Sequence, residues 1–420
     1  MLDKLVKKIN KKPEERHIAA VDIGTEFVKV LVARIDEDDT GQISAEIIGV
    51  GRKHQSLSDM HSGAIADIAG VVSNCDAALA EAEDMAGVSI EDVVMGIAGE
   101  LVKGNTTTIR YQRPDSKKEI NEPEMQEIIE RVQTRALERA RAELAWESGI
   151  DNIEITMVNA AVVNVAIDGY KVTNPIGFGG KDVSVQLFCA FAPMVHIGAL
   201  ERVALDMNLN LIAVTAEPFA VAKSVGVDYS ENFSAIFIDV GGGTTDIAVV
   251  NDGGVEGTKM FGIGGRSFTS AVAKQLNVSF EEAEKLKCEL KEDGNNEEVR
   301  KSLLPTVKVW MSGVELALSE FETIDQLPSR ILLCGGGSGL PFIPSSLKSD
   351  AWRKQLPIAD NVVVEHIKPE QVDRVVDATG KVDDYSYITP MGLVNVGLDT
   401  LYSESAGKRF VSKINRVMQS

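Results

Sequence analysis

Residues 235–250 read AIFIDVGGGTTDIAVV, and this stretch decides the fold of the chain. An apolar run ends in Asp239, three glycines and two threonines follow, and a second apolar run begins after Asp246. The pattern predicts a hairpin whose tip carries no side chains. Successive glycines can direct their N–H groups into an anion-binding nest, and a carboxylate at the strand end can hold hydrated Mg²⁺. The same letters also suit an ordinary tight hairpin.

The pattern occurs a second time, which favours the phosphate-binding interpretation. Residues 18–32 read IAAVDIGTEFVKVLV, so that Asp22 takes the place of Asp239 and Gly24-Thr25 stands at the turn. The apolar runs on both sides align as well. Self-similarity of this kind predicts a duplicated unit, here two similar lobes that face one nucleotide.

Three further segments follow in a consistent order. They are the glycine turn FGIGGRSFT at 261–269, the charged helix FEEAEKL at 280–286, and the strand with three glycines LLCGGGSGLP at 332–341. With the two Asp–Gly hairpins, they resemble the actin-like ATPase superfamily, which includes actin, MreB, sugar kinases, the seventy-kilodalton heat-shock chaperones and FtsA. The resemblance covers roughly residues 16–400.

The first lobe contains a block that is similar to one branch of that superfamily. A short apolar strand at 93–100 precedes a helical pattern at 121–146, in which Asn121 can act as the cap and Pro123 stands just inside. Two strand-like runs, 153–158 and 161–168, and the phrase DGYKVTNPIGFGGKDVSVQL follow. The block resembles the subdomain that FtsA and PilM carry in place of actin's second subdomain. The resemblance implies an α/β, two-lobed, actin-like (ribonuclease H-like) fold with an FtsA-type insert in the first lobe.

The motifs set the expected domain boundaries. The expected units are a basic amphipathic segment at 1–15, a first lobe at 16–86, 171–208 and 384–400, an insert at 87–170, a second lobe at 209–253 and 309–383, its peripheral subdomain at 254–308, and a linker with an amphipathic helix at 401–420.

The resemblance also implies roles for individual residues. Mg²⁺ is expected to be held through water by Asp22 and Asp239, and Glu217 is expected to position the attacking water. Lys29 is either a cation beside the phosphates or a surface charge. The remaining residues expected to contact ATP are Gly24, Thr25, Gly241, Gly242, Gly243, Thr244, Thr245, Gly264, Gly265, Glu284, Lys287, Gly335, Gly336, Gly337 and Ser338.

Composition excludes some classes of protein. The net charge of −20 argues against a nucleic-acid-binding body. No uninterrupted apolar run is long enough for a transmembrane helix. The four cysteines lack CxxC spacing and the five histidines do not cluster, which is typical of buried thiols in a reducing cytoplasm and argues against a metal site built on them.

Both ends of the chain are basic and amphipathic. Residues 1–12 and 407–420 each carry a net charge of +4. Short cationic amphipathic helices at chain ends suit the membrane interface. A signal peptide is disfavoured at the N-terminus because no apolar stretch follows the lysines. A frayed terminal helix is the alternative at the C-terminus, where membrane contact would be made by Phe410, Val411, Ile414, Val417 and Met418.

Three functions compete. The first is an ATP-binding, filament-forming actin homologue of the bacterial cytoskeleton, at most a slow ATPase, which tethers cell-division machinery to the inner face of the cytoplasmic membrane. Its expected partners are itself, the tail of an FtsZ-like tubulin homologue, other division proteins and anionic lipid. The second is a PilM-like cytoplasmic adaptor of a type IV pilus complex. The third is a phosphotransferase of the sugar kinase type.

Overall fold

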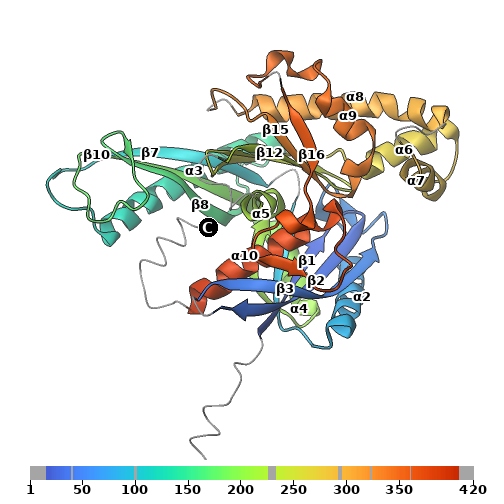
Figure 1. Ribbon diagram of the computed structural model, residues 1–420, viewed down its shortest axis with the longest axis horizontal. Helices are drawn as coiled ribbons and strands as arrows, with labels where there is room; N and C mark the ends of the chain where they lie inside the picture. The colour runs from blue at the N-terminus through green and yellow to red at the C-terminus, as the bar shows by residue number, and fades with distance from the viewer. Residues whose placement is uncertain are drawn as a thin grey trace, which may run out of the picture.

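The computed structural model describes residues 16–38, 41–98, 102–225, 233–291, 296–321, 324–359 and 361–405. Figure 1 shows two lobes, one above the other, and a third body that projects to the left. The lower, first lobe contains a six-stranded sheet with the order β11-β6-β1-β2-β3-β17. Its strands are β1 (Arg16–Ile23), β2 (Phe27–Glu37), β3 (Ile43–His54), β6 (Asp92–Ile97), β11 (Asn210–Ala216) and β17 (Val375–Asp377).

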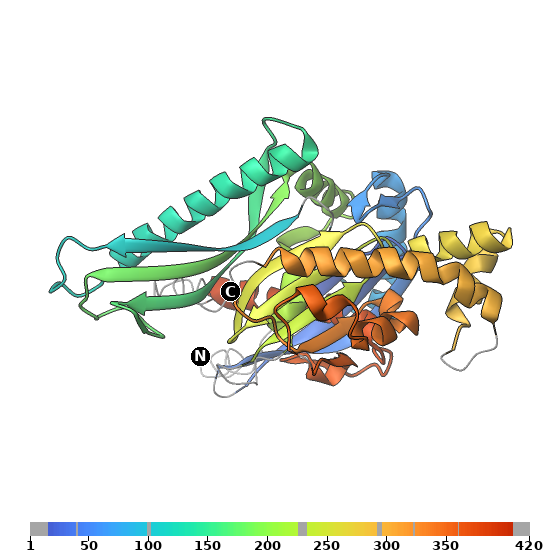
Figure 2. The same cartoon turned by 90° about the horizontal axis from the view of Figure 1, so that it is seen from above.

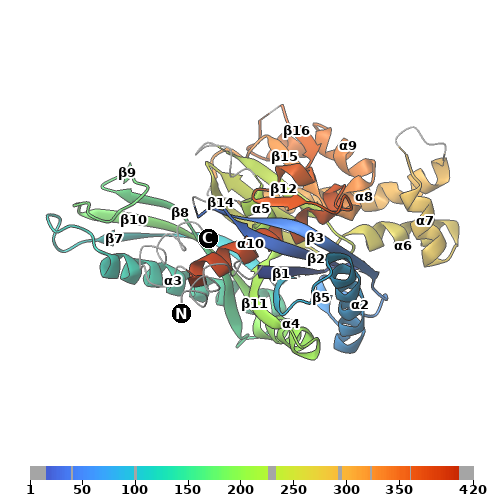
Figure 3. The ribbon, with the colours of Figure 1, turned by 60° about the horizontal axis from the view of Figure 1, so that its bottom comes forward.

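Glycines allow a helix to lie very close to the first sheet. Helix α2 (Ile68–Ala86) packs on β3, where a Cβ atom at Gly49 would stand 2.1 Å from the carbonyl oxygen of Ala82. The same holds at Gly51, where the carbonyl oxygen of Ala78 would be 1.8 Å away. Only glycine permits this approach of backbone to backbone. The sheet also packs against α4 (Met194–Asp206) and α10 (Ile388–Ser405), and a small hairpin of β4 (Met60–His61) and β5 (Ala64–Ile65) precedes α2 (Figure 3).

The second lobe is built on part of a nine-stranded sheet with the order β16-β15-β12-β13-β14-β7-β10-β8-β9. The strands of this lobe are β12 (Ala235–Val240), β13 (Thr245–Asn251), β14 (Gly254–Phe261), β15 (Arg330–Cys334) and β16 (Val363–His366). Its helices are α6 (Gly265–Leu276), α7 (Phe280–Cys288), α8 (Glu297–Ser319) and α9 (Phe342–Lys348), with short 3₁₀ turns η1 (Gly336–Gly339), η2 (Trp352–Gln355), η3 (Pro369–Gln371) and η4 (Tyr385–Tyr387).

Strand β12 is apolar from Ala235 to Ile238 because both of its faces are buried there. Ala235 and Phe237 belong to the core that is continuous with the first lobe, whereas Ile236 and Ile238 belong to the core beneath α8. A strand covered on both faces loses the alternation of polar and apolar residues. The continuous apolar run therefore correctly predicted this strand.

Two helices cross between the lobes. Helix α5 (Glu217–Ser224) packs against α10, and a Cβ atom at Gly392 would stand 2.9 Å from the carbonyl oxygen of Ala220. Helix α5 begins directly after β11, and the first turn of α10 lies beside the end of β12, where the hydroxyl of Thr389 donates to Asp239. The stretches AEPFAVAKSV at 216–225 and ITPMGLVNVGL at 388–398 predict these two interlobe helices from the sequence, and the second helix extends farther than its stretch predicts.

The projecting body consists of one helix on four strands of the nine-stranded sheet (Figure 2). The strands are β7 (Lys103–Gln112), β8 (Ile155–Ile167), β9 (Tyr170–Lys171) and β10 (Asp182–Pro193), and the helix is α3 (Glu122–Ser148). The side chain of Asn121 accepts a hydrogen bond from the backbone N–H of Glu124, so the predicted cap is confirmed. The two expected runs at 153–168 form one strand, whose register against β10 shifts at two points.

Strand pairing shifts several expected boundaries. Strand β6 lies within the expected insert but pairs in parallel with β1, whereas β10 was assigned to the first lobe and pairs with β7 and β8. Strands β11 and β17 were assigned to the second lobe and lie in the first sheet, and β14 was assigned to the peripheral subdomain and lies in the second sheet. The insert as a folded unit therefore occupies approximately residues 103–193.

Strand β14 connects the insert to the second lobe, and the hydroxyl of Thr106 in the insert donates to the carbonyl of Val255 at 2.9 Å. Gly257 and Thr258 of β14 pair with Asn105 and Gly104 of β7, so the strands of the insert continue the sheet of the second lobe. No helix in the described ranges is both long and apolar enough to cross a membrane. The expected segment at 1–15 lies outside those ranges, and so do residues 406–420 of the expected linker and amphipathic helix at 401–420, including Phe410, Val411, Ile414, Val417 and Met418. Residues 401–405 form the end of α10 rather than a linker.

Candidate nucleotide site

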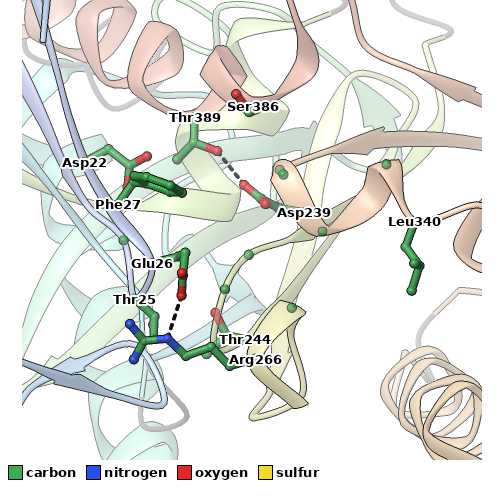
Figure 4. A pocket seen from close by; sticks show the side chains of 18 of the residues that line it. Asp22, Thr25, Glu26, Phe27, Asp239, Thr244, Arg266, Leu340, Ser386 and Thr389 are labelled. Atoms are coloured by element: carbon green, nitrogen blue, oxygen red, sulfur yellow. Dashed lines mark hydrogen bonds and ion pairs between the residues drawn. The ribbon is translucent and has the colours of Figure 1, made fainter. Parts of the chain in front are cut away.

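A cavity of about 340 Å³ lies between the two lobes, and both Asp–Gly hairpins face it (Figure 4). Asp22, Gly24 and Thr25 reach it from the β1–β2 turn of the first lobe. The β12–β13 turn of the second lobe contributes Asp239, Gly241, Gly242 and Thr244. The two copies of the motif are therefore brought to one cavity, as the duplication predicts.

Lys29 is buried in the cleft, so its interpretation as a surface charge is wrong. Its Nζ atom lies 3.0 Å from Oδ2 of Asp22, and only 13% of its side chain is exposed. Burial opposes the charged form of Lys29, but the charge and hydrogen bond of Asp22 outweigh it and raise the pKa of Lys29. The pair holds the ammonium group of Lys29 beside the first hairpin, next to the carboxylate of Asp22.

The carboxylates of the second hairpin are short of positive charge. Asp239 accepts a hydrogen bond from the hydroxyl of Thr389 on α10, and Oδ2 of Asp246 accepts one from Thr244 at 3.0 Å. The other oxygen of Asp246 is buried and has no hydrogen-bond partner among the described residues. Burial raises the pKa of Asp239, and burial with the charge of Asp239 raises the pKa of Asp246 well above its usual value.

Glu217 is the first residue of α5 and lies at the inner end of the cavity. Its side chain packs against Gly96, where a Cβ atom would stand 2.7 Å from Oε1 of Glu217. Burial, reinforced by the charges of Asp22 and Asp246, raises the pKa of Glu217 well above its usual value. A buried carboxylate of this kind can hold or orient a proton or a water at that position.

These carboxylates suit a hydrated divalent cation. Within the described ranges, no group of three or more His, Cys, Asp or Glu side chains is arranged to bind a metal directly. Mg²⁺ usually keeps several waters and uses one or two carboxylates together with phosphates. The unpartnered oxygen of Asp246 and the raised pKa values of Asp239 and Asp246 fit a site that binds such a cation. Water-mediated binding by Asp22 and Asp239 remains a prediction.

The other end of the cavity is open and flat. Gly335, with φ at +77°, and Gly337 allow the turn after β15 to pack on the second hairpin, and Leu340 and Tyr385 complete the wall. A Cβ atom at Gly336 would meet nothing within 4 Å, so this position faces open space. Such a surface can accept a flat ring.

Glu284 and Lys287 of α7 line the same end of the cavity and pair with each other. Nζ of Lys287 lies 2.7 Å from Oε2 of Glu284, and it also donates to the hydroxyl of Thr269 at 2.9 Å and to the carbonyl of Gly265 at 3.2 Å. Burial opposes ionisation of Glu284, but the charge of Lys287 lowers the pKa of Glu284 overall. Their expected contact with the ribose and adenine remains a prediction.

Thr245 lies behind the hairpin rather than on the cavity wall. It is fully buried, its hydroxyl donates to the carbonyl of Ile263 at 2.7 Å, and it accepts a hydrogen bond from Nε1 of Trp310 at 2.9 Å. Because β13 begins at Thr245, alternation turns its side chain away from that of Thr244. Thr245 therefore does not line the cavity, in contrast to the expectation.

Three other predicted residues are also set back from the cavity wall. A Cβ atom at Gly243 would meet Thr25, and one at Gly264 would meet the carbonyl oxygen of Gly241, so both glycines allow close packing of the turns. Ser338 is buried and donates to the carbonyl of Gly335 at 2.7 Å. Gly265 lines the cavity as expected.

Several cavity residues had no predicted role. Glu26 and Arg266 each directly follow one of the glycine turns, and a charged residue at a turn was the available signal. Asp246 closes the quoted hairpin. Tyr385 and Thr389 belong to no motif, and only the return of the chain through α10 brings them to the cavity.

Comparisons with known proteins support the same assignment. The family model described as "Cell division protein FtsA" matches residues 236–351. The chain is 27% identical to FtsA of Pseudomonas aeruginosa over 64% of its own length and 60% of that protein, and 24% identical to FtsA of Bacillus subtilis over 81% and 78%. The match thus spans less than two thirds of the first relative.

A solved structure confirms the fold. The structure titled "PilM-PilN type IV pilus biogenesis complex" aligns with a TM-score of 0.65 at 16% identity, covering 91% of this chain and 98% of that one. The two-lobed actin-like fold and the resemblance to FtsA are therefore confirmed, and a PilM-like neighbour fits the alternative. The chain therefore has an actin-like fold and is similar in sequence to cell division proteins of the FtsA type.

Proposed function

We propose that this chain is an ATP-binding actin homologue that forms filaments and links division machinery to the inner face of the cytoplasmic membrane, as a peripheral membrane protein. The observation that supports nucleotide binding most directly is the meeting of two Asp–Gly hairpins at one cavity, where a buried oxygen of Asp246 has no hydrogen-bond partner among the described residues. Backbone N–H groups of the glycine turns can bind phosphate, and the carboxylates can hold hydrated Mg²⁺.

Different residues of the site would have different roles. Asp22 and Asp239 would hold Mg²⁺ through water, and Glu217 would position a water for attack on the terminal phosphate. Bound ATP with Mg²⁺ supplies the phosphoryl group for transfer to water. Because such a transfer depends mainly on positioning and electrostatics, turnover is expected to be slow where one of these groups is imperfectly placed.

Gly336→Val tests the nucleotide site without disturbing the fold. At this position a Cβ atom would meet no protein atom within 4 Å, and the position lines the cavity, so valine occupies cavity space. Gly198→Val on α4 is the matched control, since its side chain also meets nothing and lies away from the cavity. Calorimetric titration with Mg-ATP should show weak binding for Gly336→Val alone. Equal affinity in both variants and the wild type would show that the nucleotide binds elsewhere.

Gly242→Val is the weaker test. A valine side chain there points toward the phosphate side of the cavity, but its Cβ atom would also stand 2.8 Å from the Cβ atom of Glu26 and 3.0 Å from the Glu26 nitrogen. Valine there would push the two hairpins apart, so a loss of binding would not separate obstruction from a shifted lobe.

The proposal of membrane tethering is supported by the basic amphipathic sequences at both termini and by the similarity to FtsA. Co-sedimentation with anionic vesicles should retain the full-length protein and release a variant that combines Phe410→Glu and Val417→Glu with deletion of residues 1–12. Electron microscopy on anionic lipid monolayers with ATP should show filaments of the full-length protein. Retention of the variant on vesicles would refute the anchor.

Two alternatives remain open to test. The fold is shared with PilM, so an adaptor that binds a short peptide is the second candidate. Dispersed particles without filaments at high concentration, together with release from vesicles, would favour it. A sugar kinase-type activity would require repeated transfer of phosphate to a sugar, measured as sugar phosphate formed per protein.

A further inference from the structure

An ion pair connects the two lobes beside the hairpin tips. Glu26 follows Thr25 at the first hairpin, and Arg266 is the second residue of α6 in the other lobe. Nε of Arg266 lies 2.7 Å from Oε2 of Glu26, with 14% and 17% of the two side chains exposed. The other oxygen of Glu26 lies 2.7 Å from Nε2 of His54 (Figure 4 shows the Arg266–Glu26 pair).

The guanidinium of Arg266 keeps unused hydrogen-bonding capacity. Its Nη2 atom is shielded from solvent and has no hydrogen-bond partner within the described ranges. Leaving a buried donor without an acceptor is unfavourable, more so when the group is charged. The rigid fork of an arginine side chain matches the oxygens of a phosphate, because two parallel N–H groups can donate to it. The free nitrogen therefore points to an acceptor supplied by a ligand.

The position of Arg266 agrees with a phosphate ligand. Its backbone N–H donates to the carbonyl of Gly242 at 2.8 Å, which fixes α6 to the tip of the second hairpin. Gly242 in turn approaches Glu26, since a Cβ atom there would stand 2.8 Å from that of Glu26. Arg266 thus lines the cavity at the place where both hairpin tips meet.

We propose that Arg266 is a phosphate-binding residue that distinguishes nucleoside triphosphate from nucleoside diphosphate, with Glu26 as the positioning residue that holds its guanidinium from the opposite lobe. The inference rests on the proposed nucleotide site and goes beyond it, because it assigns a preference between nucleotides to one charged side chain. The preference arises only where a terminal phosphate is present to accept from the free Nη2 atom.

The test compares the affinities of the full-length protein for Mg-ATP and Mg-ADP by calorimetry. Arg266→Gln should weaken ATP binding about 10- to 100-fold, as expected for a lost hydrogen bond to a charged group, and change ADP binding little. Lys274→Gln on the same helix is the matched control, because it removes one positive charge on an exposed surface outside the cavity. Glu26→Gln should reduce the ATP/ADP affinity ratio by less than Arg266→Gln.

A second variant separates loss of phosphate binding from misfolding. Arg266→Lys keeps the charge that faces Glu26 but lacks the fork, so it should lose most of the triphosphate preference while retaining the thermal midpoint. A wild type that binds neither nucleotide would overturn the proposed function and this inference together. A wild type that binds both, with an ATP/ADP ratio unchanged in Arg266→Gln and Arg266→Lys, would overturn only the role of Arg266.

Discussion

Replacing Thr245 by valine separates a structural role from a ligand-binding role at the second hairpin. Valine keeps the branched shape, so the change removes mainly the hydroxyl. That hydroxyl connects two buried groups, the indole N–H of Trp310 at 2.9 Å and the carbonyl of Ile263 at 2.7 Å. Each group left without its partner costs about 1–3 kcal/mol, so we expect a loss of about 2–5 kcal/mol in the free energy of unfolding. Mg-ATP affinity should change little.

Urea unfolding followed by tryptophan fluorescence measures this effect, since Trp310 is fully buried and reports on the second lobe. Thr108→Val on β7 is the matched control, because Thr108 is an exposed threonine on a strand and its hydroxyl makes no comparable pair of contacts. Calorimetry on the folded variant then measures nucleotide affinity. Unchanged stability of Thr245→Val together with lost affinity would restore Thr245 as a phosphate ligand and refute the packing argument.

Three more outcomes are expected. Glu217→Gln should lower phosphate release, measured colorimetrically, while Mg-ATP affinity is retained; unchanged release would remove Glu217 from the mechanism. Burial raises the folded pKa of Asp246 above its usual value of 3.8, so in Mg²⁺-free buffer its contribution to stability is present below that value and is lost as pH rises through the raised pKa. This contribution changes by about 1.4 kcal/mol per pH unit within that window, and Asp246→Asn should flatten it in urea titrations at several pH values. The side chain of Arg113 is 1% exposed and pairs with Glu124 at 2.7 and 2.9 Å. Arg113→Gln should lower the stability of the insert by about 3–5 kcal/mol, and hydrogen exchange should become faster in the insert alone.

The hairpins, their carboxylates and the interlobe helices could be predicted from sequence because each depends on neighbouring residues. An apolar run, an aspartate and a glycine turn fix the end of a strand locally, as around Asp22 and Asp239. The position of Asn121 as a helix cap is equally local. These features place most of the phosphate side of the cavity.

The remainder depends on contacts between distant segments. The sequences of β6 and β10 do not indicate which strands they pair with. The boundaries of the insert therefore depend on strand pairing that the sequence does not show. Thr244 and Thr245 are adjacent threonines that the sequence does not distinguish. The start of β13 directs Thr244 toward the cavity and Thr245 toward Trp310. The Glu26–Arg266 pair joins residues 240 positions apart, a separation at which sequence patterns carry no signal.

The pairing of β7 with β14 gives the insert two points of attachment. Along the chain, the insert leaves and re-enters the first lobe, yet its strand β7 pairs with Gly257 and Thr258 of the second lobe, and the hydroxyl of Thr106 donates to the carbonyl of Val255. A rotation of one lobe against the other must therefore either break these hydrogen bonds or carry the insert with the second lobe. If the insert is carried along, a small change in the angle between the lobes becomes a larger displacement at the far tip of the insert.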